Sequence, residues 1–224
     1  METTSLNKKA DSRMRFDYPL EETLFHKNLI LILRIAFKSI MDLNVDGNEN
    51  IPNEGPAIVA ANHVTNMDVF PMQLSINRPI FFMGKAELFE NTFIHYLFRQ
   101  LGAFPIYRGE RDEWALEHAR KILKAGNILG MFPEGTRSKG RGLKVARTGA
   151  ARLSIDLKCP VIPLSIEGSY RFSKNFPGKS KVNVVIGKPI VAEYGELPIG
   201  MTDRIITEIA RNLPAELRGV YNVA

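Results

Sequence analysis

The sequence predicts an α/β domain with a mostly parallel central sheet flanked by helices, preceded by an N-terminal amphipathic helix. Two observations carry this prediction. Short apolar runs of β character alternate with helical stretches along most of the chain, as in sheets whose parallel strands are joined by crossover helices. The composition, 45% hydrophobic and 24% charged over 224 residues, is that of one globular domain with a substantial core.

The chain begins with a polar segment and an unusually apolar helical stretch. Residues 1 to about 19 are expected to form a mobile tail, and residues 24–41 have helical periodicity. Three cations on one stripe, Lys27, Arg34 and Lys38, argue against a membrane-spanning helix. The predicted apolar side comprises Leu29, Ile30, Ile32, Leu33, Ala36, Phe37 and Ile40. Such a helix either lies in a bilayer interface or packs on the protein's own sheet.

Residues 1–41 are therefore predicted to form a tail and a membrane-interface helix, and residues 42–224 the α/β domain. Six runs are predicted as strands, at 57–61, 80–84, 103–107, 127–132, 161–166 and 182–187. Helices are predicted at 67–77, 86–101, 111–125, 146–158 and 202–213. Thr202 is the predicted N-cap of the last helix, which stops before Pro214.

The charge balance favours an anionic partner. The 30 Lys and Arg against 24 Asp and Glu give a net charge of +6, which suits a phosphorylated substrate, an acidic membrane face or nucleic acid. One cysteine, Cys159, excludes a disulfide framework and is expected to be buried. The four scattered histidines predict no metal site, and the N-terminus lacks the features of a secretory signal.

The segment NHVTNMD, residues 62–68, follows the strand predicted at 57–61 and places His63 near Asp68. A histidine is suited to general-base work, because its ordinary pKa lies near neutrality and a carboxylate on one ring nitrogen fixes its tautomer. A structural histidine held by a turn aspartate would show the same spacing. Without a GxSxG motif or a reactive cysteine, the base would activate a substrate hydroxyl or water directly.

Two further polar clusters follow predicted strands. Arg108 follows the strand at 103–107, and PEGTRS, residues 133–138, follows the strand at 127–132. Because the carboxyl ends of parallel strands meet at one edge of a sheet, these clusters are expected to converge with His63. The glycine-rich basic stretch 134–147 either binds phosphate through amides and cations or forms a solvated loop.

Four segments together identify a family. NHVTNMD, GAFPIYR (102–108), FPEGTRS (132–138) and VIPLSI (161–166) have the order and approximate spacing found in glycerolipid acyltransferases. Over residues 45–190 the sequence resembles the 1-acyl-sn-glycerol-3-phosphate acyltransferases, and this resemblance implies the fold of that family. Thr65 stands where serine is common, and Tyr107 where aspartate or lysine is frequent.

The resemblance implies a role for each matching residue. His63 corresponds to the general base and Asp68 to its orienting partner. Acceptor-binding positions correspond to Lys85, Arg108, Glu134, Gly135, Thr136 and Arg137. Pro163 matches a structural proline near the acyl pocket. No cofactor is implied, since acyl-CoA or acyl-carrier protein is a co-substrate. Backbone amides around PEGT are expected to stabilise the reaction oxyanion.

The expected reaction is transfer of a fatty acyl group to the sn-2 hydroxyl of lysophosphatidate at the cytoplasmic face of a membrane, the bacterial inner membrane being the expected one. Glycerol-3-phosphate or another lysolipid, such as a lyso-ornithine lipid, is an alternative acceptor. A hydrolase and a non-catalytic protein that binds anionic lipid are further alternatives. Nucleic acid is not an expected partner, because interleaved aromatics and a recognised binding motif are absent.

Overall fold

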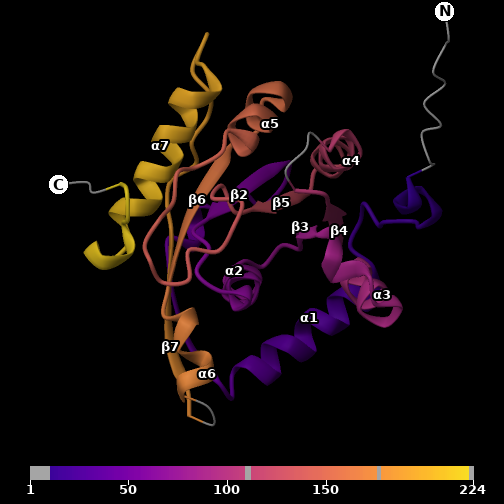
Figure 1. The fold of residues 1–224 in the computed structure, drawn as a ribbon, viewed down its shortest axis with the longest axis horizontal. Coiled ribbons are helices and arrows are strands. Elements are labelled where there is room, and N and C mark those ends of the chain that lie inside the picture. Colours follow the sequence, from indigo (N-terminus) through magenta and orange to yellow (C-terminus); the bar gives the residue numbers. More distant parts are fainter. Residues whose placement is uncertain (1–10, 109–111, 176–177, 222–224) are drawn as a thin grey trace, which may run out of the picture.

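The structure is a computed structural model that describes residues 11–108, 112–175 and 178–221. Its centre is a seven-stranded sheet in the order β1-β7-β6-β2-β5-β3-β4 (Figure 1). The strands are β1 (Met41–Asp46), β2 (Ala57–Ala61), β3 (Ile80–Lys85), β4 (Ala103–Ile106), β5 (Ile128–Met131), β6 (Val161–Glu167) and β7 (Ser180–Ile186). All six predicted strands are therefore confirmed, and β1 was missed.

Five neighbouring strands of the sheet run parallel. β6, β2, β5, β3 and β4 share one direction, whereas β7 pairs antiparallel with β6 and parallel with β1. The predicted mostly parallel sheet is confirmed. As a consequence, the carboxyl ends of the five parallel strands lie along one edge of the sheet, where the segments that follow them can meet.

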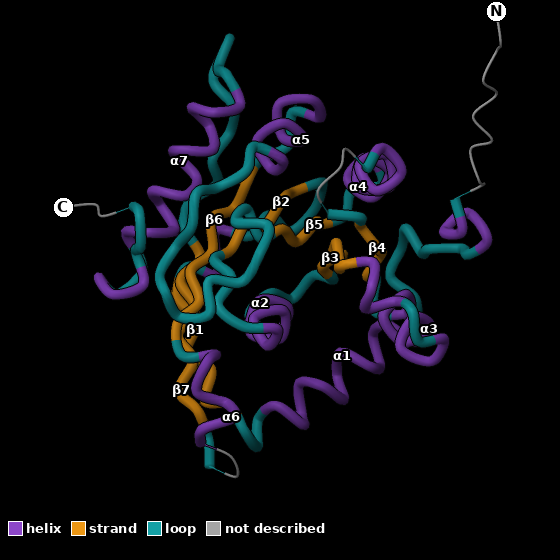
Figure 2. Tube along the Cα trace, in the orientation of Figure 1, coloured by secondary structure: helices purple, strands orange, loops and turns teal. Residues whose placement is uncertain are grey.

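Helices cover both faces of the sheet (Figures 1 and 2). α4 (Glu113–Lys124), α5 (Gly149–Leu157) and α7 (Pro198–Arg211) lie on one face, and α1 (Leu24–Phe37) and α2 (Val69–Leu74) on the other. α3 (Thr92–Gln100) contacts β4 at the sheet edge, and the short α6 (Phe172–Asn175) follows β6. The helix predicted at 86–101 is divided into a 3-10 turn at Ala86–Phe89 and α3.

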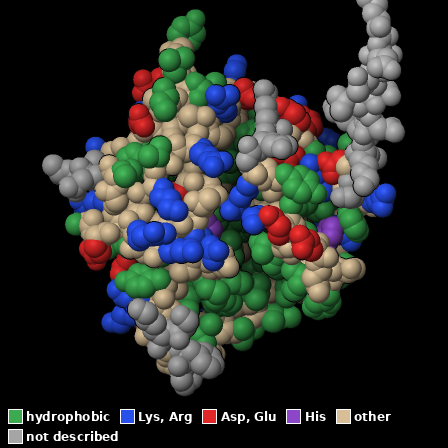
Figure 3. Space-filling view, viewed as in Figure 1, with side chains coloured by type: hydrophobic (Ala, Val, Ile, Leu, Met, Phe, Trp, Pro, Cys, Tyr) green, Lys and Arg blue, Asp and Glu red, His purple; other side chains and the backbone are tan. Residues whose placement is uncertain are grey.

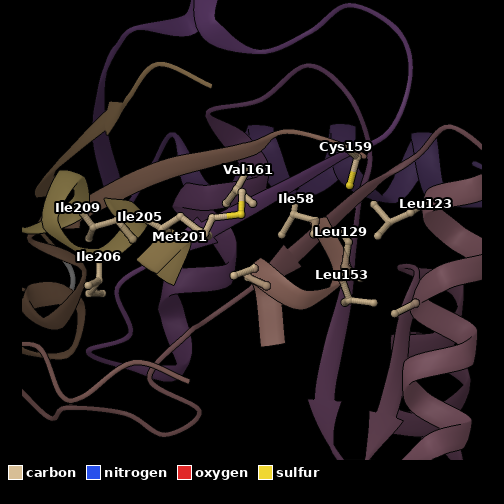
Figure 4. Packing of buried hydrophobic residues seen from close by; sticks show 14 of the residues in the cluster. Ile58, Leu123, Leu129, Leu153, Cys159, Val161, Met201, Ile205, Ile206 and Ile209 are labelled. Carbon is tan, nitrogen blue, oxygen red and sulfur yellow. The ribbon is translucent and has the colours of Figure 1, made fainter. Parts of the chain in front are cut away.

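The buried residues form two cores because strand side chains alternate between the faces. In β2, Ile58 and Ala60 belong to the core under α4, α5 and α7, while Val59 belongs to the core on the other face. Figure 4 shows the first core, in which Met201 of α7 lies near Val161 of β6. Every residue of β2 is fully buried, so packing on both faces fixes the position from which the next segment starts.

Two expectations for helix ends and tails are wrong. α7 begins at Pro198, not at Thr202, because proline is favoured in the first helical turn; Thr202 instead donates its hydroxyl to the carbonyl of Pro198. The segment from residue 11 to residue 20 is packed rather than free. Tyr18 is 6% exposed, and Asn127 donates to the Leu20 carbonyl. Residues 1–10 lie outside the described residues.

The helix expected at 24–41 is present as α1, which ends at Phe37. Phe37, a member of the predicted apolar side, is buried, as is His26. The exposed large apolar side chains of α1 are Leu24, Phe25, Leu31, Ile32 and Ile35. Within the described ranges, no helix is long and apolar enough to cross a bilayer. α1 thus packs one apolar side on the domain and presents a second one outward.

Candidate active site

The predicted histidine and aspartate form a hydrogen-bonded pair at the end of β2. His63 Nδ1 lies 2.9 Å from Asp68 Oδ2, and their exposed fractions are only 7% and 0%. Because a carboxylate oxygen accepts, Nδ1 carries the proton, and Nε2 keeps the lone pair that can take a proton from a substrate. Both the turn that follows β2 and the short 3-10 helix Asn66–Asp68 serve to bring these two side chains together.

Asp68 is fixed by hydrogen bonds on both oxygens. Oδ2 also accepts the backbone amides of Val64 at 2.6 Å and Thr65 at 2.8 Å. Oδ1 accepts the hydroxyls of Thr65 and Ser169. Asp68 is also a turn residue, since it forms a capping box with Thr65. One carboxylate therefore shapes the turn and orients the imidazole.

Glu134 joins the His63 segment to the loop that follows β5. Its carboxylate accepts the His63 amide at 2.7 Å and the Lys144 amide at 3.0 Å, and the Ser138 amide donates to the His63 carbonyl at 2.7 Å. Glu134 is 4% exposed, and burial raises its pKa although these amides oppose the shift. The ring of Phe132 stacks on His63 with centroids 4.0 Å apart. Glu134 therefore positions the histidine backbone.

Cations gather around the same edge of the sheet. Partial desolvation, together with the neighbouring charges of Arg147 and Arg137, lowers the pKa of Arg108, while Glu87 opposes the shift. The charges of Arg137 and Arg147 thus act on Arg108, so the predicted residues Arg108 and Arg137 belong to one group of cations. Figure 3 shows Lys and Arg side chains gathered on this face, over the loop after β5 and beside a broad hydrophobic surface. Such a field favours a phosphate group.

Other predicted acceptor residues have different surroundings. Lys85 ends β3 and pairs with Glu87 at 2.7 Å. Arg108 acts on the same carboxylate, and both cations lower the pKa of Glu87. Thr136 is exposed, and its hydroxyl accepts the Lys144 ammonium at 3.2 Å.

Gly135 occupies a conformation that requires glycine. Its φ is +67°, and a Cβ at this position would lie 3.0 Å from Arg147 Nε. The Arg147 side chain therefore lies directly on the Gly135 backbone. The Gly135 amide donates to the Phe132 carbonyl at 2.9 Å, so this amide of the PEGT segment is already used inside the turn and is not free for an oxyanion.

Sequence reasoning missed two residues of this site. Ser169, 1% exposed, follows β6 and reaches Asp68 across 101 positions of the chain. Ser169 could have been predicted from its position directly after VIPLSIEG, at the end of a predicted strand, because His63 was predicted from the same kind of position. Arg147 was included in the sequence analysis only as one charge of the basic stretch 134–147. Gly135 could have indicated a close contact, because the Arg147 side chain lies against it. His95 and His118 contact aromatic rings away from this site.

Comparison with known proteins gives consistent matches. The profile of the Acyltransferase family matches residues 42–167. The 1-acyl-sn-glycerol-3-phosphate acyltransferase of Bacillus subtilis is 31% identical over 169 residues, which cover 73% of this chain and 83% of that protein. The chloroplast 1-acyl-sn-glycerol-3-phosphate acyltransferase LPAT1 of Arabidopsis thaliana is 27% identical over 77% of this chain, which spans 50% of that longer protein.

A solved structure has the same fold. The crystal structure of the 1-acyl-sn-glycerophosphate acyltransferase PlsC from Thermotoga maritima superposes with a TM-score of 0.65 and 28% sequence identity. The superposition covers 80% of this chain and 76% of the Thermotoga chain. The two chains therefore share one fold over most of their length.

Proposed function

The chain belongs to the acyltransferase family, and from this premise we propose that it transfers a fatty acyl group from acyl-CoA or acyl-carrier protein to the sn-2 hydroxyl of lysophosphatidate. The observation that carries the proposal is the buried His63–Asp68 pair, which lies at the strand edge where the cations gather. The choice of lysophosphatidate as acceptor rests on the relatives, which are named as 1-acyl-sn-glycerol-3-phosphate acyltransferases. The product is phosphatidate, a precursor of membrane phospholipids.

In the proposed reaction, His63 acts as a general base. Nε2 takes the proton of the sn-2 hydroxyl while the oxygen attacks the thioester carbonyl. The resulting imidazolium is stabilised by Asp68, which bonds Nδ1. The tetrahedral intermediate collapses with cleavage of the carbon–sulfur bond, and the leaving thiolate receives the proton from His63. No acyl-enzyme forms, and His63 returns to its starting state.

Arginines provide the proposed acceptor site. Arg108 and Arg137 would bind the phosphate of lysophosphatidate, and Arg147, whose charge acts on Arg108, adds to the attraction. Binding the phosphate fixes the acceptor hydroxyl near His63, so that binding energy is converted into orientation. Lys85, paired with Glu87, would contribute to the positive field at the border of the site.

We propose that α1 holds the protein on the cytoplasmic face of a membrane, where its water-soluble donor and lipid acceptor meet. Ile32 and Ile35 are 59% and 62% exposed, and three other large apolar side chains of α1 are also exposed. The edge-to-face contact of Phe25 with Tyr96 joins this surface to α3, which exposes Phe93. A helix with such an outward apolar side, flanked by Lys27 and Lys38, suits a bilayer interface.

The test is a panel of acceptors and donors. Purified protein is incubated with lysophosphatidate, glycerol-3-phosphate or a lyso-ornithine lipid, each with labelled oleoyl-CoA or oleoyl-acyl-carrier protein. Labelled phosphatidate whose label is released by phospholipase A2 is expected, because that enzyme cleaves the sn-2 ester. Labelling of another acceptor in preference to lysophosphatidate would contradict the proposed acceptor, and release of free fatty acid alone would contradict acyl transfer.

A further inference from the structure

Arg13, which lies outside every motif, is built into the domain next to the proposed acceptor site. It is 7% exposed, and its guanidinium is paired with Asp11 and Asp112, with one nitrogen 2.9 Å from Asp112 Oδ1. The same guanidinium lies between two rings, 4.5 Å from the centroid of Tyr107 and 4.4 Å from that of Trp114. An arginine with two charged partners and two aromatic faces is held in one orientation.

The partners of Arg13 are the residues that bracket Arg108. Its Nη1 donates to the carbonyl of Pro105 in β4 at 3.3 Å, and its plane covers the ring of Tyr107, the residue directly before Arg108. Asp112 accepts the Tyr107 amide at 2.8 Å and the Ala115 amide at 3.1 Å, so it closes the connection between β4 and α4. Arg13 thus contacts both ends of the connection that carries Arg108.

Arg13 favours the charged form of Asp112. Only 9% of Asp112 is exposed; burial opposes its ionisation, but the hydrogen bonds from Arg13 and the two amides outweigh burial and lower its pKa. Without the guanidinium, a buried carboxylate would lack its counter-ion, and the Tyr107 amide would be held by a weakened partner. The expected consequence is a displaced Tyr107, and with it a displaced Arg108.

We propose that Arg13 is a positioning residue for the acceptor phosphate, acting through Asp112 and Tyr107 on Arg108. This inference rests on the proposed function, in which Arg108 binds that phosphate. The N-terminal segment is then part of the acceptor site's support, although 95 positions separate Arg13 from Arg108 in the sequence. Removal of Arg13 should therefore weaken acceptor use before it affects the chemistry at His63.

A double-mutant cycle tests the inference with the full-length protein. Steady-state kinetics with lysophosphatidate are measured for wild type, Arg13→Ala, Arg108→Ala and the double variant, with Arg15→Ala as the matched control because Arg15 is exposed on the same segment. Arg13→Ala is expected to raise KM for lysophosphatidate about tenfold with a smaller change in kcat. In the Arg108→Ala background it should add almost nothing, because its effect passes through Arg108.

A second variant covers the possibility that Arg13→Ala fails to fold. Asp112→Asn removes the charge pair and keeps a single oxygen acceptor, whereas the Tyr107 amide binds Oδ2 and the Ala115 amide binds Oδ1, so it should raise KM in the same direction. Additive effects in the cycle, an unchanged KM, or a fall confined to kcat would overturn the role of Arg13. If Arg108→Ala leaves KM unchanged, the proposed phosphate contact fails together with the inference; if only the Arg13 variant is silent, the contact stands and the inference fails.

Discussion

Replacement of Asp68 by asparagine separates the charge of this side chain from its hydrogen bonds. Oδ2 accepts three N–H groups, including His63 Nδ1, and these donors cannot reverse. Oδ1 accepts only the hydroxyls of Thr65 and Ser169, which can rotate and accept instead. The asparagine amide nitrogen can therefore occupy the Oδ1 position while its oxygen keeps the contacts of Oδ2. Asp68→Asn should preserve the turn and the tautomer of His63.

The lost quantity is the stabilisation of the imidazolium in the transition state. A hydrogen bond to a charged partner contributes about 2 to 3 kcal/mol, so kcat should fall about 30- to 150-fold. KM for lysophosphatidate should change little, because Asp68 is fully buried and does not meet the acceptor. Asp68→Ala, which also removes the acceptor of three N–H groups, should lower both kcat and the melting temperature more strongly.

The assay measures initial rates of labelled phosphatidate formation, together with thermal unfolding of each variant. Asp203→Asn serves as the control, because Asp203 is exposed on α7. A folded Asp68→Asn variant with kcat close to wild type would refute the stabilisation of an imidazolium by this carboxylate. A variant that does not fold would refute the expectation that asparagine preserves the hydrogen bonds.

Three further predictions concern the orientation of Asp68, the pH dependence of stability and membrane attachment. Ser169→Ala removes one donor to Asp68 and should lower kcat about 3- to 10-fold with little change in KM; kinetics equal to wild type would contradict its positioning role. Burial lowers the pKa of His118 to about 4 from 6.5, so the unfolded chain binds a proton that the native state does not, and stability falls as pH decreases between these values. His118→Phe should reduce the loss of unfolding free energy between pH 7.5 and pH 4.5, measured by urea denaturation, by at most about 3 kcal/mol. A loss equal to that of wild type would contradict the lowered pKa of His118. In α1, glutamine can replace three exposed apolar residues, Leu31, Ile32 and Ile35. The fraction of protein that sediments with vesicles of anionic phospholipid should then decrease, and an unchanged fraction would contradict the proposed anchor.

The arrangement of the site at the strand ends could be predicted because its signals are local. The apolar run at 57–61 is bounded by Asn62, and the polar segments after three strands are visible as clusters. Parallel pairing, once inferred from the alternation of strands and helices, requires that these segments lie at one edge. His63 and Asp68 are only five positions apart, so a turn was sufficient to join them.

Contacts between distant segments could not be predicted in the same way. Ser169 and Asp68 are 101 positions apart, and Arg13 and Asp112 are 99 apart. Neither pair has a periodic pattern, since each depends on how whole elements pack. α1 illustrates a related limit: periodicity showed that it has apolar positions, but its exposed and buried sides depend on where His26 and Phe37 dock.

His63 is the proposed base of an acyl transfer to lysophosphatidate. The most direct measurement compares phosphatidate formation by wild type, His63→Ala and the control His118→Phe, each shown to be folded at neutral pH, with labelled oleoyl-CoA and oleoyl-acyl-carrier protein. Product is expected from wild type and from His118→Phe with at least one donor, and none above background from His63→Ala. Phosphatidate formed by His63→Ala at the wild-type rate would contradict the proposed role of His63.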